Sequence, residues 1–202
     1  MCKYRLTEET KVVAGVTVHR IQALKSFGDV TEGDLGGWVA SEANLSQEGL
    51  CWVSGRACVS MDAEVSGNAQ VSGNAQVYGN ACVFGYAWVY GDAKVSGNAC
   101  VFGYAWVFRY AWVFGNARVY KNAQVFENAQ VYRNACVSGS ARVSGNAQVY
   151  GDAGVFENAL VFWNAQVSGD AWVYGNAKVF GNAQVFGDAR VYGGTVSSGE
   201  RR

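Results

Sequence analysis

The chain has 202 residues with 16 basic and 16 acidic side chains, so its formal net charge is zero. A neutral chain without a basic run disfavours nucleic acid as a partner, because Lys and Arg supply most of the affinity for phosphates. No stretch of 18 apolar residues occurs, and no apolar segment follows the first five residues. We therefore expect neither a membrane span nor a signal peptide, and take a cytoplasmic location as the default.

Residues 1–37 lie outside any repeat and are expected to form a cap. Two β-rich segments, 3–6 and 11–21, are joined by the polar stretch 7–10, which is typical of a β-hairpin. Residues 29–37 connect this hairpin to the rest of the chain. Repeat proteins expose an unpaired strand edge at each end, and a terminal hairpin covers such an edge. We predict an N-terminal β-hairpin cap over 1–37.

A six-residue unit with the consensus Ala-x-Val-(Ser/Tyr/Phe)-Gly-Asn runs from Ala57 to Tyr192 without insertion or deletion. Ala occupies the first position in all 23 units, and Val always follows two residues later. Such a unit is a short strand whose Ala and Val point inward and whose other two residues point outward. Gly and Asn or Asp then form a corner, where we expect Asn or Asp to adopt the left-handed conformation. A fixed short period of this length predicts a solenoid.

Three units close one coil of 18 residues, so residue i is expected beside residue i+18 at the strand spacing of about 4.8 Å. The predicted fold is an all-β, single-stranded parallel β-helix of triangular section over 38–194. Its narrow Ala/Val interior leaves no room for an internal ligand. Val39, Leu45 and Cys51 fall in the Ala register and lead into the repeat, and 195–202 is expected to be a polar C-terminal tail. The last coil is covered by this tail, by a partner, or by nothing.

The unit Val-x-Gly-Asn-Ala-x resembles the hexapeptide repeat of left-handed parallel β-helix proteins, a family with many acyltransferases and the γ-class carbonic anhydrases. The resemblance implies a left-handed coil, against the right-handed rule for parallel crossovers. Three stretches, KYRL at 3–6, LGGWV at 35–39 and LSQEG at 45–49, are similar to an uncharacterised bacterial and phage-borne group of these proteins. The resemblance covers essentially the whole chain and implies its fold, but it brings no activity with it.

The sequence lacks the side chains that catalysis in this family would need. Acyltransferases that resemble this fold generally use a His as general base, and the carbonic anhydrases use three His to hold a metal. The single histidine, His19, lies in the cap, and no loop interrupts the repeat. The five corner Asp residues are explained as turn residues that replace Asn. We therefore predict no catalytic residue, no metal site and no cofactor.

Outward aromatic side chains are prominent along the repeat. The residue after Val is Phe or Tyr in 16 of the 23 units, and rings stacked at strand spacing stabilise a sheet through cross-strand contact. So much exposed aromatic surface nevertheless exceeds what monomers usually carry, which indicates an interface. The richest zone spans 82–114. Its candidate binding residues are Tyr86, Trp88, Tyr90, Tyr104, Trp106, Phe108, Tyr110 and Trp112.

Other side chains recur at the 18-residue spacing. Arg109 and Glu127 are expected to pair at one corner, which contributes little if the pair is exposed. Cys82 and Cys100 are expected to be neighbours, with Cys136 farther along the same face, as reduced thiols. A self-satisfied amide ladder is expected from four residues of one row: Gln130, Gln148, Gln166 and Gln184.

These patterns favour a non-catalytic β-solenoid that self-associates, as a dimer or trimer, or binds a macromolecular partner through its aromatic rows. A second hypothesis is a ligand-binding solenoid whose rings stack on sugars or nucleobases, worth about 1–3 kcal/mol per base. A third is an acyltransferase, which rests on the resemblance in fold alone.

Overall fold

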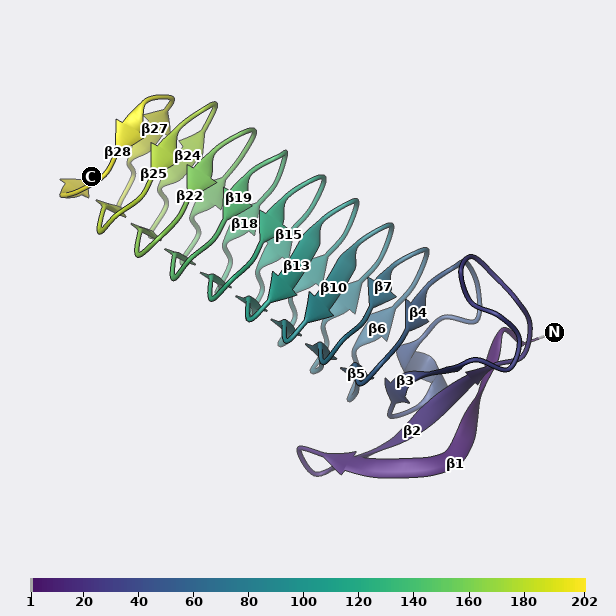
Figure 1. Ribbon diagram of the computed structural model, residues 1–202. Coiled ribbons are helices and arrows are strands. Elements are labelled where there is room, and N and C mark those ends of the chain that lie inside the picture. The colour runs from purple at the N-terminus through teal and green to yellow at the C-terminus, as the bar shows by residue number, and fades with distance from the viewer. Residues whose placement is uncertain (1) are drawn as a thin grey trace.

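The computed structural model describes residues 2–202 and shows a parallel β-solenoid preceded by a hairpin (Figure 1). Each coil contributes three short strands, and the strands of successive coils build three sheets along a prism. Residues 18 apart pair across neighbouring coils, as for Val89 and Val107, which confirms the all-β solenoid and its 18-residue coil. Within residues 2–202, no helix is long and apolar enough to cross a membrane.

The first sheet, called the cap sheet below, has 12 strands and includes the N-terminal hairpin. β1 (Tyr4–Val13) and β2 (Val16–Ala23) pair antiparallel, and β3 (Leu35–Val39) joins β2 to the first solenoid strand of the sheet. A short 3-10 helix, η1 (Glu42–Asn44), follows β3. The remaining strands of the cap sheet are β5 (Cys58–Val59), β8 (Gln76–Val77), β11 (Lys94–Val95), β14 (Trp112–Val113), β17 (Gln130–Val131), β20 (Gln148–Val149), β23 (Gln166–Val167), β26 (Gln184–Val185) and β29 (Glu200–Arg201).

The other two sheets contain solenoid strands only. The tryptophan sheet has nine strands: β4 (Trp52–Val53), β7 (Gln70–Val71), β10 (Trp88–Gly91), β13 (Trp106–Arg109), β16 (Gln124–Val125), β19 (Arg142–Val143), β22 (Leu160–Val161), β25 (Lys178–Val179) and β28 (Thr195–Val196). The cysteine sheet has eight strands: β6 (Glu64–Val65), β9 (Cys82–Val83), β12 (Cys100–Val101), β15 (Arg118–Val119), β18 (Cys136–Val137), β21 (Gly154–Val155), β24 (Trp172–Tyr174) and β27 (Arg190–Tyr192).

Ala and Val side chains fill the prism. Every Ala of the repeat from Ala57 to Ala183 has no exposed surface, and the Val side chains between them are at most 1% exposed. The cap extends this core at the N-terminal end, where Tyr4 and Ile21 pack in the same cluster as Trp52. The hairpin therefore closes the first coil with apolar side chains as well as with paired backbone.

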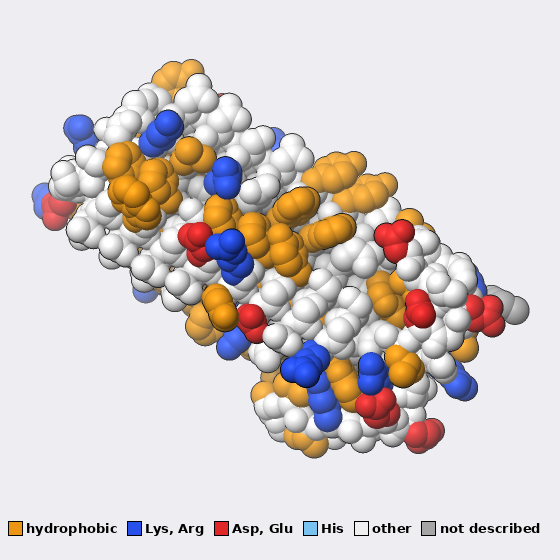
Figure 2. Space-filling view, in the orientation of Figure 1, with side chains coloured by type: hydrophobic (Ala, Val, Ile, Leu, Met, Phe, Trp, Pro, Cys, Tyr) orange, Lys and Arg blue, Asp and Glu red, His pale blue; other side chains and the backbone are white. Residues whose placement is uncertain are grey.

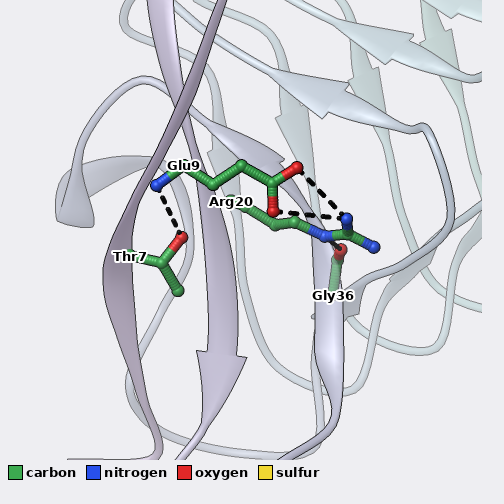
Figure 3. Close-up of polar contacts among 4 residues, drawn as sticks. All are labelled: Thr7, Glu9, Arg20 and Gly36. Atoms are coloured by element: carbon green, nitrogen blue, oxygen red, sulfur yellow. Dashed lines mark hydrogen bonds and ion pairs between the residues drawn. The ribbon is translucent and has the colours of Figure 1, made fainter.

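Arg20 fastens the hairpin to β3 (Figure 3). Its guanidinium lies 3.4 Å from both carboxylate oxygens of Glu9 on β1 and donates to the Gly36 carbonyl at 3.3 Å. The Glu9 amide in turn donates to the Thr7 hydroxyl at 3.3 Å. One side chain thus links all three antiparallel strands of the cap.

The corners differ from the expectation in one respect. The left-handed residue is the one before Asn or Asp, which is usually Gly, with φ of 66° at Gly67 and 69° at Gly97. A Cβ at Gly97 would lie 2.9 Å from the Gly115 carbonyl oxygen of the next coil, so Gly also permits close stacking. Seven larger residues nevertheless occupy this position with positive φ: Met61, Arg109, Lys121, Glu127, Arg133, Glu157 and Trp163.

Asn at the corner has a different role from the one expected. Its side chain bonds to the corner residue of the next coil, as in Asn98, whose amide donates to Asn116 Oδ1 at 2.9 Å. This ladder continues through Asn134, which donates to Asp152 at 2.8 Å. The amide ladders of the protein therefore lie at the corners.

The predicted register before residue 51 was wrong. Val39 pairs with Val59, and Leu45 bridges to Val65, so both occupy the Val position of the coil and are 20 residues from their partners. Two extra residues at the corner between Leu45 and Cys51 absorb the difference, since Trp52 pairs with Gln70 at the usual spacing of 18.

Residues 195–202, expected to be a polar tail, contain two strands of the solenoid. β28 pairs parallel with β25, and β29 pairs parallel with β26. Val196 fills an interior position and is buried. Two left-handed glycines, Gly193 and Gly194, replace the usual corner before β28.

Candidate aromatic binding surface

Trp88 and Trp106 form the centre of the aromatic surface on the tryptophan sheet. β10 and β13 pair in parallel with these two residues in register, and the rings stack at 5.8 Å with an interplanar angle of 16°. Two residues along each strand, Tyr90 and Phe108 stack at 4.9 Å and 2°. Tyr90 also meets both indoles edge to face, at 6.4 and 6.5 Å. The strand register therefore holds four rings in a fixed arrangement.

Two tyrosines extend this surface at the corner that precedes β10 and β13. Tyr86 and Tyr104 occupy the Asn position of their units and stack at 4.9 Å and 7°. Trp88 and Trp106 are 46% and 39% exposed, and both tyrosines are more exposed still. We call these six residues the tryptophan patch: Tyr86, Trp88, Tyr90, Tyr104, Trp106 and Phe108. Figure 2 shows hydrophobic side chains gathered over the middle coils and again near the C-terminal end of the face in view.

The remaining two candidate residues lie at the next corner and just beyond it. Tyr110 is exposed at the corner that follows β13, whereas Trp112 lies on β14 in the cap sheet. The Trp112 ring packs on Phe114 at 4.5 Å, and its Nε1 donates to the Ser96 hydroxyl at 3.2 Å. These contacts leave Trp112 half-buried. Because β14 belongs to the cap sheet, Trp112 is not part of the patch.

A groove of about 370 Å³ borders the tryptophan patch on its N-terminal side. The connection after the hairpin forms one wall, because Phe27 packs edge to face on Trp52 at 5.4 Å. Tyr86 and Trp88 form the opposite wall. Polar side chains lie along the groove as well, and these are Ser54, Asn68, Gln70 and Ser72. This groove was not predictable from the sequence, because it depends on how residues 27–30 fold back over the first coils.

Few charges lie near the patch. Arg109 and Glu127 form the predicted pair at 3.1 Å, and both side chains are substantially exposed. The second Glu127 carboxylate oxygen accepts the Gly145 amide at 2.6 Å. The pair thus fixes a corner at the edge of the tryptophan sheet and leaves the patch itself uncharged.

The cysteine row and the predicted glutamine row occupy the other two faces. Cys82 and Cys100 are register neighbours on the cysteine sheet, and all six cysteines are free thiols. Burial raises the pKa of the Cys82 thiol, and the neighbouring Cys100 adds to the increase. The expected glutamine ladder is not formed within residues 2–202: Gln148 and Gln166 instead accept hydrogen bonds from Tyr132 and Tyr150, at 3.4 and 3.5 Å.

His19 lies in the cap, away from the solenoid faces. It is on β2 between β1 and β3, where it pairs with Thr10 and Val39. The ring is half-buried, and its Nδ1 lies 3.3 Å from the Thr7 carbonyl oxygen. These contacts are those of a side chain that joins two strands.

Comparison with known proteins gives two partial matches. The YdcK beta solenoid repeat family model matches residues 75–91 and 183–199. The chain is also 39% identical over 61 residues to the "Uncharacterized acetyltransferase YdcK" of Escherichia coli strain K12. That alignment covers 26% of this chain and 19% of the relative, so the chain matches about a fifth of that protein's length. Over these segments the chain is similar to a YdcK-type β-solenoid, in agreement with the coils described above.

Proposed function

We propose that this chain is a non-catalytic β-solenoid scaffold that binds another protein surface, a partner or a second copy, through the tryptophan patch. The observation that carries the proposal is the exposed Trp88–Trp106 stack, held in register by β10 and β13. Rigid aromatic side chains lose little conformational freedom on binding and are enriched in the centres of protein interfaces. The absence of charge inside the patch fits the same use, because interface centres are depleted of charged residues.

The test is the solution mass of the purified chain, measured by light scattering over a concentration series. Trp88→Ala with Trp106→Ala is compared with wild type, and Trp163→Ala is the control because Trp163 is an exposed tryptophan that lies at a corner, away from β10 and β13. A wild-type dimer or trimer that only the double variant dissociates supports self-association through the patch. A wild-type monomer directs the same variants to binding assays with candidate protein partners. An oligomer that the double variant leaves intact contradicts the self-association form of the proposal.

The groove beside Trp88 supports a second candidate, binding of a sugar or nucleobase. It combines an indole face with hydroxyl and amide side chains, which is the combination that orients a polar ring on an aromatic surface. Titration with oligosaccharides and nucleotides, followed by tryptophan fluorescence, is the measurement. Binding that disappears in Trp88→Ala supports this candidate, and unchanged fluorescence throughout opposes it.

The name of the E. coli relative raises acetyl transfer as a third candidate. In the hexapeptide acyltransferases that the repeat resembles, a His usually acts as base, and His19 is the single His of this chain. Its ring lies between strands of the cap. Acetyl-CoA turnover that is lost in His19→Ala would overturn the non-catalytic proposal.

A further inference from the structure

One outward row of the cysteine sheet, the residues that precede Val, is complementary to itself in size about β18. The seven strands from β9 to β27 place β18 in the middle, with three strands on each side. One outward residue precedes Val in each strand, and these residues are in register from coil to coil: Cys82, Cys100, Arg118, Cys136, Gly154, Trp172 and Arg190. At equal distances from Cys136, a small residue always corresponds to a large one: Arg118 to Gly154, Cys100 to Trp172, and Cys82 to Arg190.

Such a pattern fits a second copy related by two-fold symmetry. The two-fold axis lies in this face, runs along β18 and is perpendicular to the direction in which the coils stack. Rotation about it gives a second copy whose long axis is antiparallel to that of the first. The rotation leaves the position of each residue along its strand unchanged. It places each coil opposite the coil of the other copy that lies at the same distance on the other side of β18. In the row that precedes Val, large side chains of one copy then lie opposite small ones of the other. In the row that follows Val, rings lie opposite rings, as Tyr120 does Phe156. Each contact occurs twice, as in any isologous interface.

One pair of opposite charges at an edge of the sheet follows the same symmetry. Lys121 and Glu157 occupy one corner column at the edge of the sheet, each one coil from Gly139. Both have positive φ, 60° and 58°, at a position that Gly usually occupies. Within residues 2–202, neither forms an ion pair. Across the axis, Lys121 of each copy lies opposite Glu157 of the other, which gives two reciprocal ion pairs.

The corner on the other edge of the sheet repeats this complementarity with uncharged donors. Three Asn precede the centre and three Asp follow it, so each amide lies opposite a carboxylate of the second copy. The pairs are Asn116 with Asp152, Asn98 with Asp170, and Asn80 with Asp188. Each Asn amide has two N–H groups, and in this ladder one of them serves the neighbouring coil.

A hollow of about 610 Å³ lies on the same face, with Ser138 and Gly139 among its lining residues. Rings stack regularly up to Tyr120, which lies 5.0 Å from Phe102, but Ser138 interrupts the row and is only 5% exposed. Phe156 leaves the row because Gly154 lets its ring lie flat; a Cβ at Gly154 would collide with that ring. The two-fold axis brings Tyr120 and Arg118 of the second copy over Phe156 and Gly154.

We propose that two copies of this chain associate antiparallel through the cysteine sheet, about a two-fold axis at β18. This inference goes beyond the proposed function because it uses a different face from the tryptophan patch. The size complementarity of the row before Val, the reciprocal positions of Lys121 and Glu157 and the hollow favour a second copy of the chain as the occupant of this surface.

Charge exchange tests the proposal by sedimentation equilibrium of the full chain. Lys121→Glu places two carboxylates opposite each other, and Glu157→Lys places two ammonium groups opposite each other. Each is expected to weaken the dimer by about 10-fold or more. Lys121→Glu combined with Glu157→Lys restores the dimer. An equimolar mixture of the two single variants forms a heterodimer, a result that a purely local role for either residue would not produce. Lys94→Glu, an exposed charge reversal on the cap sheet, is expected to change nothing.

A second variant tests the hollow. Ser138→Phe restores the ring that the repeat usually has and is expected to weaken the dimer by about 10-fold. Ser168→Phe, on the cap sheet, is the matched control. Circular dichroism confirms that both variants keep the wild-type strand content.

The outcomes separate this inference from the proposed function. A wild-type chain that stays monomeric at all concentrations overturns the inference, as does a dimer unaffected by both charge variants. A dimer lost in Trp88→Ala with Trp106→Ala, but not in the charge variants, places the interface on the tryptophan patch. A dimer that depends on Lys121 and Glu157, and not on the two tryptophans, supports the inference and removes self-association from the role of the patch.

Discussion

The interior and the exterior of the prism use the same strands but tolerate substitution very differently. Inside, 23 consecutive units keep Ala and Val, and nearly all of these side chains are completely buried. Outside, the residue after Val alternates among Phe, Tyr and Ser, and the residue before Val ranges from Gly154 to Trp172. The interior is narrow and accepts only small or medium apolar side chains, including Leu45 and Cys51 in the first coils, so it determines the fold. The exterior is free to differ between faces, and both proposed surfaces lie there.

Val113 on β14 and the residue that follows it, Phe114, provide the largest expected contrast. Val113→Ser removes buried methyl groups and places a hydroxyl in an Ala/Val interior, and we expect a loss of about 3 kcal/mol of unfolding free energy. Phe114→Ser changes the neighbouring outward residue to one that seven units already carry. It removes a ring stack on Tyr132 at 4.8 Å, and we expect a loss of about 1 kcal/mol. Urea unfolding of both variants is the measurement, and equal losses would contradict the distinction between interior and exterior.

A variant in the cap tests whether the buried core continues beyond the repeat. Tyr4 is buried, and its hydroxyl donates to the Leu45 carbonyl at 2.6 Å. Tyr4→Phe leaves that carbonyl without its donor, and we expect a loss of about 1–2 kcal/mol at neutral pH. Tyr192→Phe is the control because Tyr192 is exposed.

The same variant is expected to change the pH dependence of stability. Burial, reinforced by the charge of Glu42, raises the pKa of Tyr4 above its ordinary value of 10.0. The folded protein then keeps this proton while the unfolded chain loses it. The contribution of Tyr4 is therefore fully present below pH 10 and declines as the pH rises above that value. Urea unfolding between pH 8 and 11 should show a steeper decline for wild type than for Tyr4→Phe, and parallel curves would contradict the assignment.

The periodic part of the fold was predictable because a strict period leaves one solution. Ala and Val at fixed positions determined the coil length and the pairing of residues 18 apart, as at Val89 and Val107. The register at Val39 was not predictable, because the two additional residues before Cys51 lie where the period has not begun. β28 and β29 were missed for a related reason: Thr195 and Glu200 pair through backbone groups, and their side chains follow no alternation.

The candidate site, too, was predictable only where it follows the period. The stack of Trp88 on Trp106 follows from their spacing of 18, so the sequence indicated it. The separation of Trp112 from the patch depends on which side of a corner it falls, and the groove depends on Phe27 packing against Trp52 across a non-repetitive loop. The self-complementarity of the cysteine sheet was also present in the sequence, but it becomes visible only when the residues are sorted by coil and by face.

The corners of the coils are less conserved from unit to unit than the interior and more constrained than the outer faces. A substitution there gives the smallest expected change in unfolding free energy. Arg133 has φ of 61° at a position that is usually Gly, and within residues 2–202 its side chain forms no ion pair. The left-handed conformation costs a non-glycine residue about 1–2 kcal/mol, whereas Gly loses about 0.5–1 kcal/mol more than Ala through the flexibility of the unfolded chain. Arg133→Gly should therefore stabilise the protein by about 0.5 kcal/mol.

Gly115, one coil earlier in the same column, provides the opposite change. It has φ of 72°, and a Cβ there would lie 2.9 Å from the Arg133 backbone nitrogen. Gly115→Ala should therefore destabilise by about 1–2 kcal/mol. Thermal unfolding of the two variants and wild type measures both effects. Stabilisation by Arg133→Gly would mean that the larger corner residues are kept at a local cost, which is what a surface role for Lys121 and Glu157 requires. Destabilisation would mean that the Arg133 side chain contributes to the fold, and the same explanation would then extend to Lys121 and Glu157.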